Sequence, residues 1–369
     1  MDMSKARYIL IGGFLGAGKT TAILKLASHL KAQGHRIGLI TNDQAGGLVD
    51  TARARAADWP VEEIAGGCFC CRFPSLIEAS QKLAASSHPD VFLAEPVGSC
   101  TDLVATVAFP LRQMYGADWL IAPFSVVVDP VRAARVLGLE TGAQFSEKVV
   151  YIYRKQLEEA DIIVINKCDL LDTTRRAALR AAVAAQFPCA EIFECSARSG
   201  AGLDAWFARI TTSEIGPHAA MDVDYQLYGQ GEALMGWLNA KLNVSTPKAF
   251  DGNLLLTDLA GRLRAQLQNA HAEVAHLKMT LAPGPNPLAI GAVSLVRNDQ
   301  QPELTHSLLD TLASGELTLN LRAEAAPELL EHVVRRVAAG WLGIKLDVTK
   351  LESFRPGQPN PTHRIVNPV

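Results

Sequence analysis

The residues with the clearest chemistry in this 369-residue chain form the run Gly13-Phe14-Leu15-Gly16-Ala17-Gly18-Lys19-Thr20. The run fits the pattern G-x-x-x-x-G-K-[ST] between a strand-like run and a helix-like segment, which is the context of a phosphate-binding loop. Its glycines let backbone N–H groups point at phosphate oxygens, and the helix N-terminus adds positive potential. We predict that Lys19 contacts the β- and γ-phosphates and that Thr20 ligates Mg²⁺. The predicted phosphate-binding residues are Gly13, Gly16, Ala17, Gly18, Lys19, Thr20 and Thr21.

Two later motifs predict which base is bound. Asn166-Lys167-Cys168-Asp169 and Ser196-Ala197-Arg198 each follow a predicted strand. The Asp169 carboxylate is able to accept hydrogen bonds from the N1 and N2 donors of guanine, which adenine does not offer in the same pattern, and such a site rejects analogues by about four orders of magnitude. We therefore predict GTP over ATP, bound by Asn166, Lys167, Asp169, Ser196, Ala197 and Arg198. The alternative is that the N-K-x-D run is only a capped turn before a helix.

The turn Glu95-Pro96-Val97-Gly98 follows another predicted strand, Val91–Ala94. A carboxylate there is suited to hold a Mg²⁺-bound water or to orient an attacking one, so Glu95 and Lys19 are the predicted catalytic residues. The backbone N–H of Gly98 is predicted to face the γ-phosphate. A segment that closes over the nucleotide is predicted at Asn42, Asp43, Gly46 and Gly47.

Three cysteines lie close together in Gly66-Gly67-Cys68-Phe69-Cys70-Cys71. In a straight strand Cys70 and Cys71 would point to opposite faces, so convergence on one ion needs an irregular loop, which the preceding glycines permit. Thiolates suit Zn²⁺ and other borderline ions, with Glu63, Cys100 or water as candidates for a fourth position. A redox-active thiol pair and inert buried thiols remain alternatives. The other cysteines, Cys168, Cys189 and Cys195, are predicted to be packing residues.

These motifs need a scaffold that brings strand ends to one edge, and the first two thirds of the chain predict one. Short apolar runs alternate with helical segments, which indicates an α/β fold with a doubly wound, mostly parallel sheet over residues 1–215. The predicted strands are Tyr8–Ile11, Arg36–Thr41, Val91–Ala94, Ser125–Val128, Asp161–Ile165 and Glu191–Cys195. The predicted helices are Thr20–Gln33, Leu76–Ala85, Lys148–Glu159, Thr174–Phe187 and Ala201–Ile210.

The composition changes after Ile210, and a linker leads to a smaller α+β domain predicted over residues 222–369. Its predicted strands lie near Leu234–Asn243, Ala275–Leu281, Ala289–Arg297 and Glu316–Ala323. Its predicted helices lie near Asp251–His271 and Pro327–Leu342, and a proline-rich tail covers Phe354–Pro368.

Composition excludes several classes of protein. With 49% hydrophobic residues the chain is not disordered, and a net charge of -3 without a basic block argues against nucleic acid or a membrane surface as partner. No apolar run approaches the roughly 18 residues needed to span a bilayer. Seven cysteines, an odd number, do not fit a secreted disulfide scaffold, so we expect a cytoplasmic protein.

Taken together, Gly13–Thr20, Gly66–Cys71, Glu95–Gly98 and Asn166–Asp169 resemble the CobW-like branch of the metal-chaperone GTPases, which belong to the SIMIBI class of P-loop NTPases. The run G-C-x-C-C is similar to that branch's signature, and Glu63 matches a glutamate four residues ahead of its glycine. The resemblance covers residues 7 to about 210. Pro96-Val97 and Ser99-Cys100 depart from the residues more usual in the family, and its histidine-rich tract is missing.

The resemblance implies a function and partners. It implies binding of GTP or GDP with Mg²⁺, slow hydrolysis of GTP, and Zn²⁺ or another divalent ion on Cys68, Cys70 and Cys71. A client metalloprotein or cofactor enzyme would receive the metal, the C-terminal domain would face that client, and a nucleotide-dependent homodimer is expected. The alternative function is a GTP-dependent activator or escort of a cofactor enzyme, such as a corrinoid protein, without metal delivery.

Overall fold

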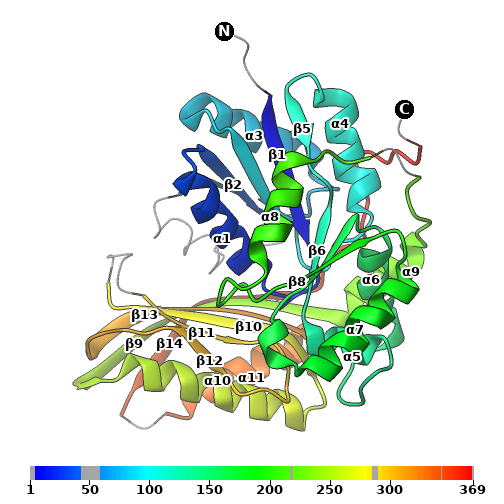
Figure 1. Cartoon of the computed structure of the whole chain (residues 1–369). Coiled ribbons are helices and arrows are strands. Elements are labelled where there is room, and N and C mark those ends of the chain that lie inside the picture. The colour runs from blue at the N-terminus through cyan, green and yellow to red at the C-terminus, as the bar shows by residue number, and fades with distance from the viewer. Residues whose placement is uncertain (1–4, 43–58, 217–218, 285–289, 342, 368–369) are drawn as a thin grey trace. The chain divides into compact units, whose positions relative to one another are not determined.

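A parallel sheet runs through the first part of the computed structural model, which describes residues 5–42, 59–216, 219–284, 290–341 and 343–367. Its strands are β1 (Ala6–Gly12), β2 (Ile37–Asn42), β3 (Val61–Ile64), β4 (Val91–Glu95), β5 (Trp119–Ile121), β6 (Ser125–Val128), β7 (Ile162–Ile165) and β8 (Glu191–Glu194). The order is β3-β2-β4-β1-β6-β7-β8, with β5 also beside β1, and all the pairings are parallel (Figure 1). The predicted α/β fold is therefore confirmed. The strands β3 and β5 were not predicted.

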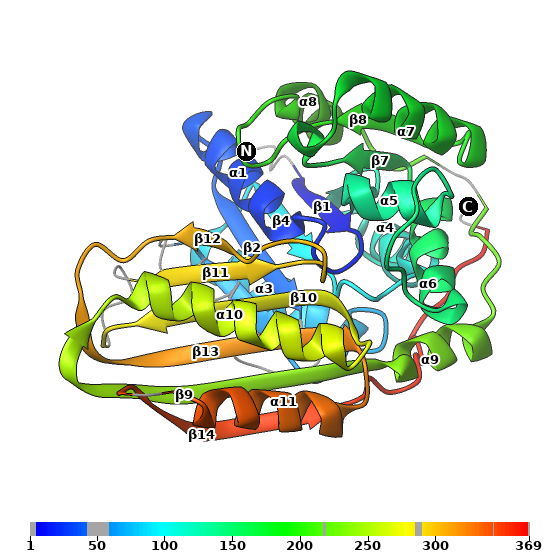
Figure 2. The ribbon, with the colours of Figure 1, turned by 90° about the horizontal axis from the view of Figure 1, so that it is seen from below.

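Helices cover both faces of this sheet, as Figure 2 shows. They are α1 (Lys19–Ala32), α3 (Phe73–Ser87), α4 (Phe109–Tyr115), α5 (Pro130–Val136), α6 (Glu147–Glu158), α7 (Thr173–Gln186) and α8 (Leu203–Thr212). A π-helical turn, η1 (Val104–Ala108), precedes α4, a 3-10 turn, η2 (Cys168–Leu170), precedes α7, and α9 covers Tyr225–Leu234. Among the helices of the described residues, none has the length and apolarity to cross a bilayer.

The two-sided burial explains the composition of the strands. Every residue of β6 and β7 is buried, as expected for parallel strands covered on both faces.

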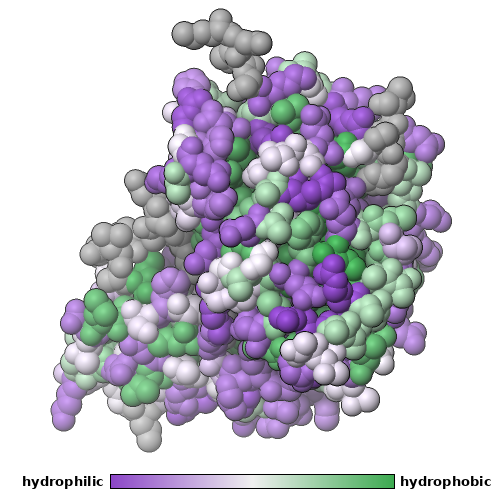
Figure 3. Space-filling view, viewed as in Figure 1, coloured by the Kyte–Doolittle hydropathy of each residue, from purple (hydrophilic) through white to green (hydrophobic). Residues whose placement is uncertain are grey.

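On the face seen in Figure 3, hydrophilic residues dominate around α3, whereas polar and apolar residues are interspersed elsewhere on the first unit.

The second unit is an antiparallel sheet with two helices on it. Its strands are β9 (Met235–Phe250), β10 (Glu273–Ala282), β11 (Gly291–Leu295), β12 (Glu303–His306), β13 (Leu312–Glu324) and β14 (Lys345–Phe354), in the order β12-β11-β10-β13-β9-β14. The helices α10 (Gly252–Asn269) and α11 (Pro327–Ala339) contact each other, and they pack on β10 and β11 and on β9 and β14 respectively (Figure 2). Leucines fill the core between sheet and helices. The predicted α+β class is confirmed, whereas β12 and β14 were not predicted.

The C-terminal tail is placed differently from the prediction. The described part of the second unit covers residues 229–358, whereas residues 359–367 belong to the first unit. The backbone N–H of Thr362 donates to the Cys70 carbonyl at 2.8 Å, and that of Ile365 donates to the Ala105 carbonyl at 2.9 Å. Arg364 pairs with the buried Asp102 at 2.7 Å. These bonds tie the tail to the first unit, which explains why the predicted second domain, 222–369, does not match the observed division.

Glu159, directly after α6, supplies a test of the first unit's packing. Its carboxyl accepts hydrogen bonds from the Thr101 hydroxyl at 3.1 Å and the Val104 N–H at 3.0 Å. Burial raises the pKa of Glu159 to about 8. The hydrogen bond from the Val104 N–H lowers this pKa, and the charge of Asp102 raises it further. The folded state therefore retains a proton that the unfolded state releases near pH 4.5, so stability falls as the pH rises from about 4.5 to about 8.

Glu159→Gln, which never ionises, is expected to lose this pH dependence. As the pH rises across this range, the free energy of unfolding of the native chain should fall relative to that of the variant by up to about 1.4 kcal/mol per pH unit. Urea unfolding at pH 5 and pH 7.5 measures the difference. Glu158→Gln, at the exposed neighbouring position, is the control. An equal difference between Glu159→Gln and the native chain at both pH values would contradict the proposed protonation.

Candidate functional site

The phosphate-loop candidate joins β1 to α1 as predicted. Gly13 has φ 125° and Gly18 has φ 98°, a region that favours glycine. A Cβ atom on Gly13 would lie 2.1 Å from the Val127 carbonyl oxygen, and one on Gly18 would lie 2.4 Å from Nδ2 of Asn166. Only glycine fits these positions. The loop therefore has the bare, curled backbone that a phosphate cradle needs.

Lys19 and Thr20, which begin α1, face this loop and the end of β4. The buried Lys19 donates from Nζ to the carbonyls of Gly13 at 2.8 Å and Phe14 at 3.4 Å. The Thr20 hydroxyl lies 3.0 and 2.9 Å from the two carboxylate oxygens of Glu95. A hydroxyl beside a carboxylate offers the oxygen ligands that Mg²⁺ prefers. The donor set therefore fits the predicted cation.

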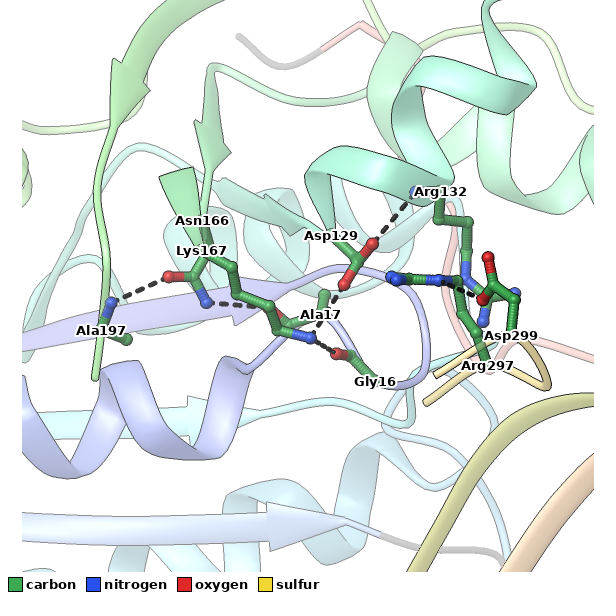
Figure 4. Close-up of polar contacts among 9 residues, drawn as sticks. All are labelled: Gly16, Ala17, Asp129, Arg132, Asn166, Lys167, Ala197, Arg297 and Asp299. Carbon is green, nitrogen blue, oxygen red and sulfur yellow. Dashed lines mark hydrogen bonds and ion pairs between the residues drawn. The ribbon is translucent and has the colours of Figure 1, made fainter. Parts of the chain in front are cut away.

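Asn166 and Lys167 brace the phosphate loop (Figure 4). Asn166 donates from Nδ2 to the Ala17 carbonyl at 2.9 Å, and its Oδ1 accepts the Ala197 N–H at 2.9 Å. Lys167 donates from Nζ to the Gly16 carbonyl at 2.6 Å and pairs with Asp129 at 2.9 Å. Two residues predicted to contact the nucleotide thus tie together the loops after β1, β7 and β8.

The predicted base-reading residues lie on the loops that Asn166 joins. Asp169 belongs to η2 and is exposed, as is Arg198, whereas Ser196 and Ala197 are buried. The Cys168 N–H donates to the Cys195 carbonyl at 3.0 Å, which ties the turn that carries Asp169 to the end of β8. An exposed carboxylate on this braced turn is suited to read a base, and that role stays a prediction.

Asp169→Asn is expected to weaken GTP binding relative to xanthosine triphosphate. Xanthine carries an oxygen where guanine carries the N2 donor, so an amide suits it better than a carboxylate does. Hydrogen bonds to charged groups contribute about 1.5–3 kcal/mol, so the preference should shift by about 10- to 100-fold. Competition binding with the two nucleotides measures it. Asp204→Asn, an exposed site on α8, is the control, and an unchanged preference in Asp169→Asn would remove the residue from the base site.

The three clustered thiols converge as predicted. The chain turns at Gly66 and Gly67, whose φ values are 80° and 150°. The Sγ atom of Cys68 lies 2.9 Å from that of Cys70 and 3.2 Å from that of Cys71, and the last two are 3.8 Å apart. Zn–S bonds of about 2.3 Å place tetrahedral thiolates about 3.8 Å apart, so these thiols need only small shifts to hold Zn²⁺.

Hydrogen bonds between thiols divide the charge of the cluster unevenly. Bonds from Cys100, Cys70 and Cys71 hold the pKa of Cys68 well below its ordinary value. The hydrogen bonds that Cys70 forms with Cys100 and Cys68 raise the pKa of Cys70 well above its ordinary value. The hydrogen bond between Cys71 and Cys68 raises the pKa of Cys71. The neighbouring thiols thus favour the charged form of Cys68, which suits a soft cation. A bound metal would displace the protons of the neighbours.

Two residues that support the cysteine loop were not predicted in this role. Asn42, at the end of β2, donates from Nδ2 to the Gly67 carbonyl at 2.7 Å, and its Oδ1 accepts the Phe69 N–H at 2.9 Å. The backbone N–H of Asn360, in the tail, lies 3.2 Å from Sγ of Cys71. The position of Asn42 at a strand end was a usable signal, whereas nothing in the sequence connects Asn360 with Cys71, 289 positions away.

Two predictions need correction or lie outside the description, and a third stays a prediction. The ligand atoms that lie within 4.8 Å of one another are the three thiols, while Glu63 lies in β3 opposite Thr41, so its place in the metal site stays a prediction. Cys189 is exposed and not a packing residue, whereas Cys195 is buried as predicted. Asp43, Gly46 and Gly47 lie outside the described residues.

Comparisons with known proteins match the part of the chain that carries the phosphate loop. The nucleotide-binding domain model of the family CobW/HypB/UreG matches residues 7–194. Zinc chaperone CobW of Pseudomonas aeruginosa is 27% identical over 220 residues, which are 53% of this chain and 57% of that protein. Zinc chaperone YeiR of Escherichia coli is 32% identical over 165 residues, 43% of this chain and 46% of that protein. The chain thus spans about half the length of these curated relatives.

Among solved structures, the Zn(II)-bound YjiA GTPase from E. coli aligns with 91% of this chain and 99% of its own, with a TM-score of 0.34 and 13% identity. The hydrogenase maturation factor HypB from Archaeoglobus fulgidus aligns with 55% of this chain and 87% of its own, with a TM-score of 0.39 and 23% identity.

Proposed function

Because the chain belongs to the CobW/HypB/UreG family, we propose that it is a GTP-hydrolysing metallochaperone that holds Zn²⁺, or a similar divalent ion, on Cys68, Cys70 and Cys71. Both curated relatives described above are named zinc chaperones, which favours metal delivery over the escort of a cofactor enzyme. The three converging thiols give this chain a donor set for such an ion.

One observation carries the proposal: the segments that would bind nucleotide and metal leave neighbouring strands of one sheet. The phosphate loop follows β1, Glu95 ends β4, Asn42 ends β2 and the cysteine loop follows β3. These strands are neighbours in the order β3-β2-β4-β1 and all are parallel. Their carboxyl ends therefore meet at one edge, where ligands of parallel sheets usually bind. A change in one segment is transmitted to the next through direct packing.

In the proposed reaction, Lys19 holds the β- and γ-phosphates, and Thr20 with Glu95 positions Mg²⁺, which neutralises charge on the phosphates when it is bound. Glu95 orients the attacking water, the Gly98 N–H faces the γ-phosphate, and Asp169 reads guanine. The nucleotide state then alters the affinity of the cysteine loop for metal.

We further propose the setting of this cycle. The second unit faces a client metalloprotein, the active form is a nucleotide-dependent homodimer, and the protein acts in the cytoplasm. The free thiols of all seven cysteines support a reducing compartment.

The binding of GTP with and without Zn²⁺ tests the proposal. Coupling between two sites is reciprocal and typically amounts to about 5- to 150-fold, so Zn²⁺ is expected to change the affinity for a non-hydrolysable GTP analogue by at least about fivefold. Isothermal titration at constant Mg²⁺ measures this change. The matched control is the chain with Cys68, Cys70 and Cys71 replaced by serine, in which the effect of Zn²⁺ should disappear. Equal affinities of the native chain for the GTP analogue with and without Zn²⁺ would contradict the proposed coupling.

A further inference from the structure

Cys100 lies on the segment that leaves β4, five positions after Glu95. Its side chain is only 2% exposed, and its N–H donates to the Val97 carbonyl at 3.0 Å, which closes a turn. The residue is therefore fixed inside the first unit, on the same segment as the carboxylate that faces Thr20.

The Cys100 thiol lies beside two other thiols. It forms hydrogen bonds with the side chains of both Cys68 and Cys70. It is not among the sulfurs that all lie within 4.8 Å of one another, so it contacts two members of the cluster without completing it. A buried cysteine often acts as a small apolar residue, but here its neighbours are two candidate metal ligands. A movement of the Cys100 sulfur toward the third sulfur would make a four-thiolate set, which is typical of a closed zinc site.

The Cys100 turn also touches the nucleotide half of the site. A Cβ atom on Gly98 would lie 3.0 Å from Nζ of Lys19, so the backbone there passes beside the ammonium group. Gln156 donates from Nε2 to the carbonyls of Gly98 at 3.0 Å and Cys100 at 2.8 Å. This shared donor links Gly98 and Cys100, so a displacement at Gly98 would be passed on to Cys100.

The same turn carries signs of a second arrangement. Ser99 is fully buried, and within the described residues its hydroxyl has no hydrogen-bond partner. Asp102 has φ 64°, a left-handed conformation that costs a non-glycine residue free energy. An unsatisfied hydroxyl and a strained residue both reduce the free energy needed to rearrange this turn.

On the basis of the proposed function, we propose that Cys100 is a fourth thiolate ligand of the ion held by Cys68, Cys70 and Cys71, and that the nucleotide decides through the Gly98–Cys100 turn whether it binds. The step is a ligand exchange. The Cys100 thiol releases its proton to solvent, its sulfur donates an electron pair to the metal, and the ligand in the fourth position, such as water, leaves. No oxidant is needed.

X-ray absorption of Zn²⁺ bound to the native chain tests the proposal without relying on any variant. Spectra are recorded without nucleotide, with GDP and with a non-hydrolysable GTP analogue. The expected result is four sulfur neighbours in at least one state and three sulfurs with one lighter atom in another. In Cys100→Ser we expect three sulfurs in every state and, where the native chain shows four, zinc affinity lower by about tenfold or more. Cys189→Ser, at an exposed position, should match the native chain.

The outcomes separate this proposal from the function on which it rests. Three sulfurs in every state of the native chain would overturn the role of Cys100 and leave a three-thiolate chaperone intact. Four sulfurs in every state would overturn the control by nucleotide. Failure of the native chain to bind Zn²⁺ in any state would overturn both this inference and the metal half of the proposed function.

Discussion

Replacement of Lys19 by alanine is expected to abolish GTP binding and hydrolysis while the fold is retained. The Lys19 ammonium is buried against the loop carbonyls, 2.8 Å from that of Gly13, where it is placed to meet the phosphates. Removal of one partner from a buried charge pair costs about 3–5 kcal/mol, so affinity should fall by more than about 100-fold. Alanine is the best helix former, so α1 should still form. Titration with a fluorescent GTP analogue in Mg²⁺ measures the loss.

The matched control is Lys25→Ala. Lys25 lies on the same helix but is exposed, so this variant removes the same charge without touching the loop. It should bind GTP as the native chain does, and both variants should unfold at temperatures close to that of the native chain. A Lys19→Ala protein that hydrolyses GTP at the native rate would refute the phosphate-loop assignment.

The strands that carry the site were predictable because their burial leaves a strong pattern. The strands β1, β4, β6 and β7 consist largely of buried Val, Ile, Leu and Ala, as parallel strands between two layers of helices must. By contrast, β3 has the sequence Val-Glu-Glu-Ile and β12 has Glu-Leu-Thr-His, and most of their residues are only partly buried or exposed. Four residues of mixed polarity beside other strands carry no period long enough to detect.

The residues of the site were likewise predictable where the local sequence determines their place, and not where distant contacts do. The convergence of the three thiols followed from local chemistry, because two glycines precede cysteines whose side chains a regular strand would separate. The support of the cysteine loop by Asn360 did not, because that contact joins distant segments and depends on where the tail returns. The fourth position stayed open for a related reason: the place of Glu63 is set by the pairing of β3 with β2, which sequence spacing does not reveal.

Replacement of Cys68, Cys70 and Cys71 by serine is expected to remove stoichiometric zinc. The native chain should retain about one Zn²⁺ per chain, and the variant should retain close to none, because a serine hydroxyl does not ionise as a thiol does and is a poor ligand for this ion. Metal analysis after dialysis against Zn²⁺ gives the ratio. Since Zn²⁺ at 100 times its dissociation constant stabilises a protein by about 2.7 kcal/mol, added Zn²⁺ should also raise the unfolding temperature of the native chain only.

Cys189→Ser separates loss of the site from loss of a thiol. Because Cys189 is exposed and lies between α7 and β8, away from the cysteine loop in sequence, this control should keep its zinc and its zinc-dependent stabilisation. GTP binding in the triple variant supplies the second check: the phosphate loop follows a different strand, so the variant should still bind GTP if it is folded. A folded triple variant that retains one Zn²⁺ per chain would move the metal site elsewhere. A variant that loses zinc and keeps GTP would show that the two sites are chemically separate, so that any effect of one ligand on the other must pass through the segments between them.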